Sequence, residues 1–253
     1  MTDIRTAANA ALPPERQTSR NLVVLLLDAS GSMLEPGPNR RIPRVEELNS
    51  ALQAFASHDM HAIPQLETNG EIAIGVFSGD SFRWLDLAPD AVRPPPPFAY
   101  AAYVRSVPEI SAAGSTPMDL AITAALDAVR ERKVSLSIEG RTHESRPIVF
   151  LLTDGQPTEP MHDALVALRD AERSKAVLFF ALGTGNARAE WLELIAPEAH
   201  YPLRDQPLRS YLEFVSTSMS AIAGIDDSAE AIYRTVRVAN SRANVMAQEF
   251  LET

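Results

Sequence analysis

Three short segments of the chain carry side-chain oxygen atoms beside apolar runs: 28–32 (DASGS), 114–117 (GSTP) and 153–155 (TDG). Five of their side chains offer two carboxylates and three hydroxyls, with neither nitrogen nor sulfur. The five side chains are those of Asp28, Ser30, Ser32, Thr116 and Asp154. Mg²⁺ favours such a set, because it takes octahedral oxygen coordination with one or two carboxylates and several waters. The residue types therefore predict a site for Mg²⁺, with Mn²⁺ or Ca²⁺ as alternatives.

The spacing of these residues would allow their side chains to bind one ion. Asp28, Ser30 and Ser32 occupy alternate positions of one loop, so their side chains can be aimed at one point. Gly31 and Gly155 allow the backbone to turn tightly beneath an ion.

Each segment also has a purely structural interpretation. Asp followed by Gly is ordinary turn chemistry after a strand. The sequence GSTPMD equally predicts the start of a helix, with Thr116 as N-cap and Pro117 in the first turn. DASGS alone is also typical of a loop. The metal site would be absent only if all three structural interpretations were correct at the same time. The combination of the three segments therefore favours a metal site.

Alternating strand and helix patterns must position these loops. Continuous apolar runs at 21–27, 146–155 and 176–185 are typical of strands covered on both faces. The carboxyl ends of parallel strands meet at one edge of the sheet, where α/β proteins bind their ligands. We therefore expect the oxygen-rich loops to converge at that edge.

The remaining elements complete an α/β pattern. Further strands are expected at 71–79, at 81–89 as its hairpin partner, and weakly at 199–203. Helices are expected at 43–57, 116–136, about 160–173 with Leu165 and Leu168 facing inward, 187–196 and 207–225. This order predicts a mainly parallel central sheet with an antiparallel edge strand and helices on both faces.

Composition narrows the classes of function. The chain has 253 residues, 45% of them hydrophobic, and no cysteine, which excludes disulfides, a thiolate nucleophile and a cysteine-based zinc site. The formal net charge of −10 disfavours nucleic acid as a partner. No apolar run reaches the roughly 20 residues of a membrane span, and the first residues lack the apolar run of a signal peptide. We therefore expect a cytoplasmic protein that binds neither membrane nor nucleic acid.

The two ends differ from the centre in pattern. Residues 1–20 show no periodicity and are expected to form a flexible leader before one domain at 21–225. In the C-terminal extension, 226–253, Ile232, Val236 and Val238 fit a short amphipathic element or strand. Further apolar side chains that could pack on the domain or dock on a partner are those of Val245, Met246, Phe250 and Leu251.

The motifs, in their order along the chain, resemble the metal-ion-dependent adhesion site (MIDAS) of von Willebrand factor type A (VWA) domains. That site is Asp-x-Ser-x-Ser with a distant Thr and Asp, and all five positions match. The resemblance implies a three-layer, Rossmann-like VWA fold. It also implies that Ser30, Ser32 and Thr116 bind the metal through hydroxyls, while Asp28 and Asp154 act directly or through water. An open coordination position would then accept a Glu or Asp side chain of a partner protein.

One segment resembles a narrower group. RPIVFLLTDGQPTE, at 146–159, is similar to the corresponding segment of TerY-like bacterial proteins of tellurite-resistance and stress-response operons. The resemblance implies work beside a protein kinase and a PP2C-type phosphatase. The chain departs from that group in PGPNRRIPR at 36–44, in FAYAAYVRSVPEI at 98–110 and in the tail after Asp226.

Enzymatic alternatives lack necessary groups. A haloacid-dehalogenase-type phosphatase needs a general acid two residues after its nucleophilic Asp, and Ser30 stands there. No glycine-rich loop ends in Lys-Ser/Thr, GTGNA at 183–187 lacks a third glycine for a dinucleotide loop, and DASGS lacks the first glycine of a serine-hydrolase motif. We therefore predict a non-enzymatic, metal-dependent protein-interaction module. A metal-independent scaffold subunit of a multiprotein complex is the alternative, ahead of the phosphatase.

Overall fold

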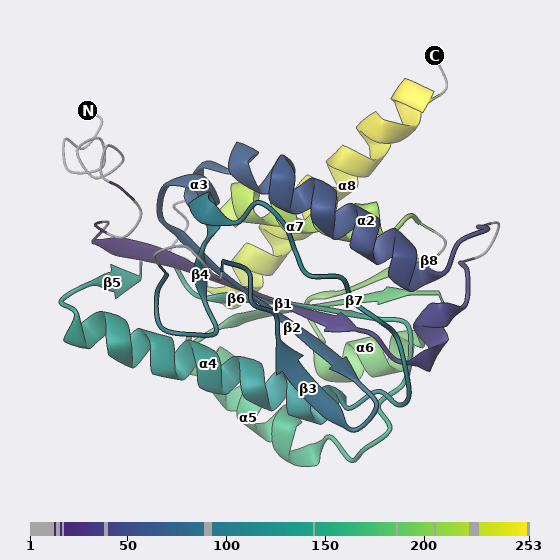
Figure 1. Ribbon diagram of the computed structural model, residues 1–253, viewed down its shortest axis with the longest axis horizontal. Coiled ribbons are helices and arrows are strands. Elements are labelled where there is room, and N and C mark those ends of the chain that lie inside the picture. The colour runs from purple at the N-terminus through teal and green to yellow at the C-terminus, as the bar shows by residue number, and fades with distance from the viewer. Residues whose placement is uncertain are drawn as a thin grey trace.

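A single sheet runs through the centre of the molecule, with helices on both of its faces (Figure 1). The computed structural model describes residues 13, 16, 18–37, 40–88, 93–143, 145–185, 187–204, 206–222 and 228–251, apart from the side chains of 204 and 242–251. The strands are β1 (Ser19–Asp28), β2 (Gly70–Ser78), β3 (Ser81–Trp84), β4 (Ala99–Tyr100), β5 (Thr142–His143), β6 (Ile148–Thr153), β7 (Leu178–Thr184) and β8 (His200–Arg204).

The sheet is mainly parallel, as the sequence predicts. Its strand order is β3-β2-β1-β6-β7-β8, with β4 added to β2 and β5 added to β1. Strand β2 pairs antiparallel with β3 and β4, whereas β1 pairs parallel with β2, β5 and β6. Residues 22–27 of β1 are at most 1% exposed, because helices cover both faces of this central strand. The predicted mainly parallel sheet with an antiparallel edge strand is therefore confirmed.

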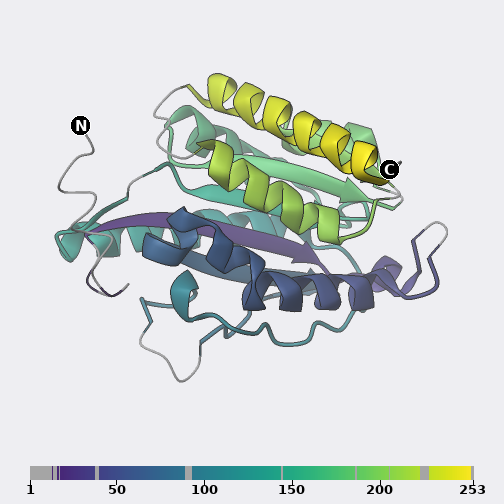
Figure 2. The same ribbon diagram turned by 90° about the horizontal axis from the view of Figure 1, so that it is seen from above.

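The helices divide between the two faces. Figures 1 and 2 show α2, α7 and α8 on one face and α4, α5 and α6 on the other. The helices are α2 (Arg44–Ser57), α3 (Pro64–Asn69), α4 (Met118–Ile138), α5 (His162–Arg173), α6 (Ala189–Ile195), α7 (Arg209–Ile222) and α8 (Ala229–Leu251), with short 3-10 turns η2 (Gly31–Leu34), η3 (Asp59–Ala62) and η4 (Ala101–Tyr103). No described helix is both long and apolar enough to cross a membrane.

Several boundaries differ from the sequence prediction; β3, for example, ends at Trp84 rather than at 89. Two of the differences have a structural reason. Strand β1 begins at Ser19, within the expected leader, because the Arg20 side chain is fully buried in an ion-pair network. Most of the remaining leader lies outside the described residues. Helix α4 begins at Met118, Pro117 occupies its cap position, and no side chain caps it. The N-cap interpretation of Thr116 is therefore wrong.

The C-terminal extension forms a long helix, α8, where a short element or strand was expected. Its first half packs on the domain: Ile232, Tyr233 and Val236 are buried, whereas Val238 is 47% exposed. The Tyr233 hydroxyl accepts a hydrogen bond from the Phe179 backbone N–H at 3.1 Å and donates to Glu172 at 2.8 Å. The side chains of Val245, Met246, Phe250 and Leu251 lie outside the described residues.

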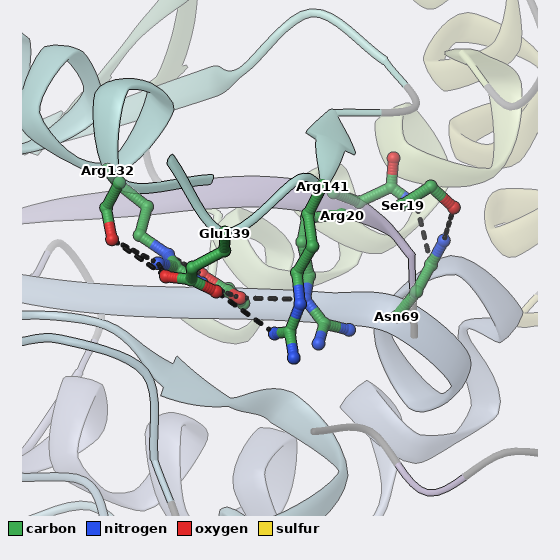
Figure 3. A network of polar contacts seen from close by, with 9 residues as sticks. Ser19, Arg20, Asn69, Arg132, Glu139 and Arg141 are labelled. Carbon is green, nitrogen blue, oxygen red and sulfur yellow. Dashed lines mark hydrogen bonds and ion pairs between the residues drawn. The ribbon is translucent and has the colours of Figure 1, made fainter. Parts of the chain in front are cut away.

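A buried charge network lies near the amino ends of β1 and β2 (Figure 3). Glu71 of β2, fully buried, accepts hydrogen bonds from Arg132 Nε at 2.6 Å and Nη2 at 2.8 Å. Arg20 Nε lies 3.0 Å from Glu71, and its guanidinium lies over the Tyr100 ring. Arg132 also pairs with Glu139 at 2.7 Å. The network binds α4 to the sheet at the end opposite the oxygen-rich loops.

Candidate metal site

The first oxygen-rich loop begins where β1 ends. Asp28 is the last residue of that strand and its side chain is fully buried. Its Oδ1 accepts a hydrogen bond from the Ser30 backbone N–H at 2.8 Å, and its Oδ2 accepts one from the Thr153 hydroxyl at 2.6 Å. Strand pairing explains the second contact. Leu27 of β1 pairs with Leu152 of β6, so the residues that follow them, Asp28 and Thr153, lie side by side. Asp28 is therefore fixed by its own loop and by the neighbouring strand.

Short polar contacts continue from this loop to the end of β6. The Ser30 and Ser32 hydroxyls lie 3.0 Å apart, and the Ser32 hydroxyl donates to Asp154 Oδ1 at 2.6 Å. Because the Ser32 hydroxyl donates its proton to Asp154, it accepts from Ser30 with one lone pair, and its other lone pair remains available to a cation. Four of the five predicted residues thus form one cluster.

Thr116 joins this cluster through Gly155. A methyl group at position 155 would lie 3.3 Å from Thr116 Oγ1 and 3.9 Å from Asp28 Oδ2, so a glycine here lets the three loops come close. The Thr116 segment is held by the Thr158 backbone N–H, which donates to the Thr116 carbonyl at 3.2 Å. The Gly31 N–H also donates to the Gly114 carbonyl at 2.8 Å. The structure therefore brings all five predicted side chains together.

The site holds two buried carboxylates close to each other, and this shapes their acidity. Burial raises the pKa of Asp28 to about 6, although hydrogen bonds from Ser30 and Thr153 oppose the shift and the charge of Asp154 adds to it. Burial also raises the pKa of Asp154, against hydrogen bonds from Ser32 and Arg44. Paired carboxylates in a low-dielectric site favour a bound cation. Its positive charge offsets the repulsion between the two carboxylates, which little water is present to screen.

The donor set fits a hard divalent cation. Its oxygens come from two carboxylates and three hydroxyls, all described above. Within the described residues, no group of three or more His, Cys, Asp or Glu side chains is placed to hold a metal. A cation at this site would therefore depend on hydroxyls and water for most of its ligands, which suits Mg²⁺ and Mn²⁺.

Two residues of the site were not predicted from the sequence. The sequence pattern places Thr153 only beside Asp154, yet its hydroxyl holds Asp28. Arg44, the first residue of α2, is 4% exposed and its Nη1 donates to Asp154 Oδ2 at 3.0 Å. The signal for Thr153 was its position at the end of a strand beside the strand that ends in Asp28. The sequence carries no signal for Arg44, because a basic residue near a helix start resembles an ordinary solvated one.

A family model matches the sequence of the chain, and solved structures share its fold. The family model of the von Willebrand factor type A domain matches residues 23–210. No curated protein sequence matches the chain. Among solved structures, the pilus adhesin SpaC from Lactobacillus rhamnosus GG is similar over 81% of this chain and 31% of the adhesin, with 13% identity and a TM-score of 0.55. The SpRpn10 VWA domain is similar over 78% of this chain and 95% of that chain, with 11% identity and a TM-score of 0.51. Identities this low show a common fold, and this chain spans less than a third of the adhesin's length.

Proposed function

The chain belongs to the von Willebrand factor type A family, and we propose that it is a non-enzymatic module that binds a partner protein through a divalent metal. Domains of this family commonly mediate protein–protein interactions and often bind a divalent metal. The finer proposal is that Mg²⁺ or Mn²⁺ occupies the five-residue site, and that a Glu or Asp side chain of the partner completes its coordination.

The convergence of the five oxygen-bearing side chains is the observation that supports this proposal. They come from three loops far apart in the sequence, and the contact between Thr153 and Asp28 alone joins residues 125 positions apart. Ser30, Ser32 and Thr116 would hold the metal through hydroxyls, and Asp28 and Asp154 would hold it directly or through water. A cation held mainly by neutral hydroxyls keeps much of its positive charge and so attracts a further carboxylate.

The net negative charge of the protein affects how it would associate with an acidic partner. The formal net charge of −10 repels an acidic partner at long range, but salt screens this repulsion beyond about 8 Å at physiological ionic strength. Recognition would therefore depend on the short-range attraction of the metal, and association should become faster as ionic strength rises.

The segment at 146–159 supports a more specific setting. Its similarity to TerY-like proteins suggests a cytoplasmic protein of a bacterial stress-response or tellurite-resistance system, with a protein kinase and a PP2C-type phosphatase as partners. We include these partners in the proposal, and the experiments on the metal site do not depend on them.

The proposal is tested by calorimetric titration of metal-stripped protein with Mg²⁺ and Mn²⁺. We expect saturable binding in the wild type, and its loss in Asp28→Ala and in Thr116→Ala, because each change removes one of the five oxygen donors. Asp127→Ala is the control, since that carboxylate is half-exposed on α4 and pairs with Arg130. Binding that persists in both site variants would contradict the proposed site.

Partner capture then separates metal-dependent recognition from a scaffold. The tagged domain is used to capture candidate kinase and phosphatase partners in the presence of Mg²⁺ or a chelator. Recognition through the metal predicts that chelator and Asp28→Ala abolish capture equally. Capture that is unaffected by both would instead favour the metal-independent scaffold.

A further inference from the structure

Arg44 is a buried cation beside the candidate metal site that the proposed function does not require. Its Nη1 donates to Asp154 Oδ2 at 3.0 Å and to the Ser32 carbonyl at 3.1 Å. The residue is 4% exposed, and its backbone N–H donates to the Glu35 carbonyl at 3.2 Å. Its positive charge is therefore held against two loops of the site.

The loop after β7 is shaped around this guanidinium. Gly185 adopts a φ of +55°, and a methyl group there would lie 2.6 Å from Arg44 Cζ and Nη2 and 2.7 Å from Nε. A larger residue at 185 would thus force the guanidinium to move. Gly185, the second glycine of the GTGNA segment, therefore leaves room for the Arg44 guanidinium.

The charge balance gives this arrangement a consequence for ligand binding. A divalent cation between Asp28 and Asp154 would leave the cluster neutral, whereas Arg44 makes its net charge +1. We propose that Arg44 is a built-in counter-ion of Asp154 that weakens binding of the cation while strengthening binding of an anionic ligand to it. This inference rests on the proposed function, because it concerns the same metal site.

A simpler possibility is that Arg44 only ties α2 to the end of β6. The two alternatives differ in the sign of one measurement. If Arg44 acts only through structure, its removal loosens the site and leaves Mg²⁺ binding weaker or unchanged. If it acts as a counter-ion, its removal destabilises the metal-free protein but makes Mg²⁺ bind more tightly.

Calorimetric titration of metal-stripped protein with Mg²⁺ measures this sign. For Arg44→Met we expect the Kd for Mg²⁺ to fall by at least about tenfold, because one charge acting on a divalent ion a few ångströms away has this effect even through water, and a larger one in the less polar site. Arg44→Lys keeps the charge and should stay close to the wild type. Arg41→Met removes the same charge from an exposed position nearby and should also leave the Kd unchanged.

Gly185→Ala tests the same contact without removing Arg44. The added methyl group displaces the flexible guanidinium and also strains the loop backbone at its φ of +55°. Strain alone would weaken Mg²⁺ binding, so a Kd that shifts in the same direction as in Arg44→Met still separates the two alternatives. In the double variant the two effects should not add, because both act on one interaction. This arm keeps the test decisive if Arg44→Met fails to fold.

A small anion tests the second half of the inference. With Mn²⁺-loaded protein, acetate that reaches the metal has its methyl proton resonance broadened. We expect about fivefold weaker acetate binding in Arg44→Met than in the wild type and in Arg41→Met. Unchanged or weaker Mg²⁺ binding in both Arg44→Met and Gly185→Ala, or equal acetate binding, would overturn the inference and leave the metal site standing. Absence of Mg²⁺ binding in every variant would instead overturn the proposed function, and this inference with it.

Discussion

Replacement of Asp28 by Asn should stabilise the metal-free protein while it removes the response to metal. The wild-type carboxyl has a pKa of about 6 in the folded chain, against an ordinary value of 3.8. A difference of about two pKa units corresponds to about 3 kcal/mol for keeping this group ionised at neutral pH. Asn has the same shape but no charge, so up to about 3 kcal/mol of unfolding free energy should be recovered.

The contacts of Asp28 make Asn a suitable replacement. One side-chain oxygen still accepts from the Ser30 N–H, and the new amide can donate to the Thr153 hydroxyl, which at present donates to Asp28. The contacts around the loop are therefore kept in number. The amide is a weaker metal ligand than a carboxylate, so Mg²⁺ should no longer stabilise the variant.

Urea denaturation at pH 7.5 measures both effects. In chelator, Asp28→Asn should be more stable than the wild type. With Mg²⁺ at about a hundred times its Kd, the wild type should gain about 2.7 kcal/mol and the difference should nearly close. Asp127→Asn, which changes a half-exposed carboxylate on α4, serves as the control. Lower stability of Asp28→Asn in chelator, or an undiminished Mg²⁺ response, would refute the reasoning.

The same carboxyl predicts a pH dependence of known sign. Because its folded pKa lies above its unfolded value, the stabilising proton is fully held below about pH 4 and is lost as the pH rises through about 6. In chelator, the wild type should therefore gain about 1 kcal/mol relative to Asp28→Asn when the pH falls from 7.5 to 5.5. Parallel pH profiles of the two proteins would show that Asp28 does not titrate in this range.

Three further substitutions test neighbouring contacts. Thr153→Val removes the hydroxyl that donates to Asp28, so calorimetry should show Mg²⁺ binding weakened several-fold while the fold persists. Glu71→Gln leaves the buried guanidiniums of Arg20 and Arg132 without their counter-ion. Urea denaturation should show that the unfolding free energy falls by about 3–5 kcal/mol. A fall below about 1 kcal/mol would mean that water compensates the two buried charges. Tyr233→Phe removes two hydrogen bonds between α8 and the domain and should cost about 1–3 kcal/mol, while unchanged stability would show that α8 contributes little at this point.

The sequence predicts the layers and the five side chains of the candidate site because both depend on local patterns. Six apolar residues in a row at 22–27 can be covered on both faces only in a central strand. The order of strand and helix then brings the ends of β1 and β6 to one edge. Asp28 and Asp154 converge there because Asp28 ends β1 and Asp154 directly follows β6.

Contacts that depend on three-dimensional neighbours were not predictable in the same way. Arg44 is buried because Gly185, 141 positions later, leaves space for it, and neither residue alone indicates the pair. The sequence pattern places Arg20 in the leader, because its burial depends on Glu71 of another strand. In α8, the exposed Val238 interrupts the apolar stripe of Ile232 and Val236, so the pattern indicated a shorter element than the helix that forms.

The long-range assembly of the site also bears on how the protein folds. Ser32 and Asp154 are separated by 122 positions, and the strand that carries Asp28 pairs with three strands that are distant in the sequence. No early, local structure can therefore present the full ligand set, and these non-local pairings form slowly. A metal that recognises only the finished edge of the sheet would leave the refolding rate nearly unchanged and would slow unfolding. Mg²⁺ would then stabilise the completed domain kinetically and extend the lifetime of its folded state.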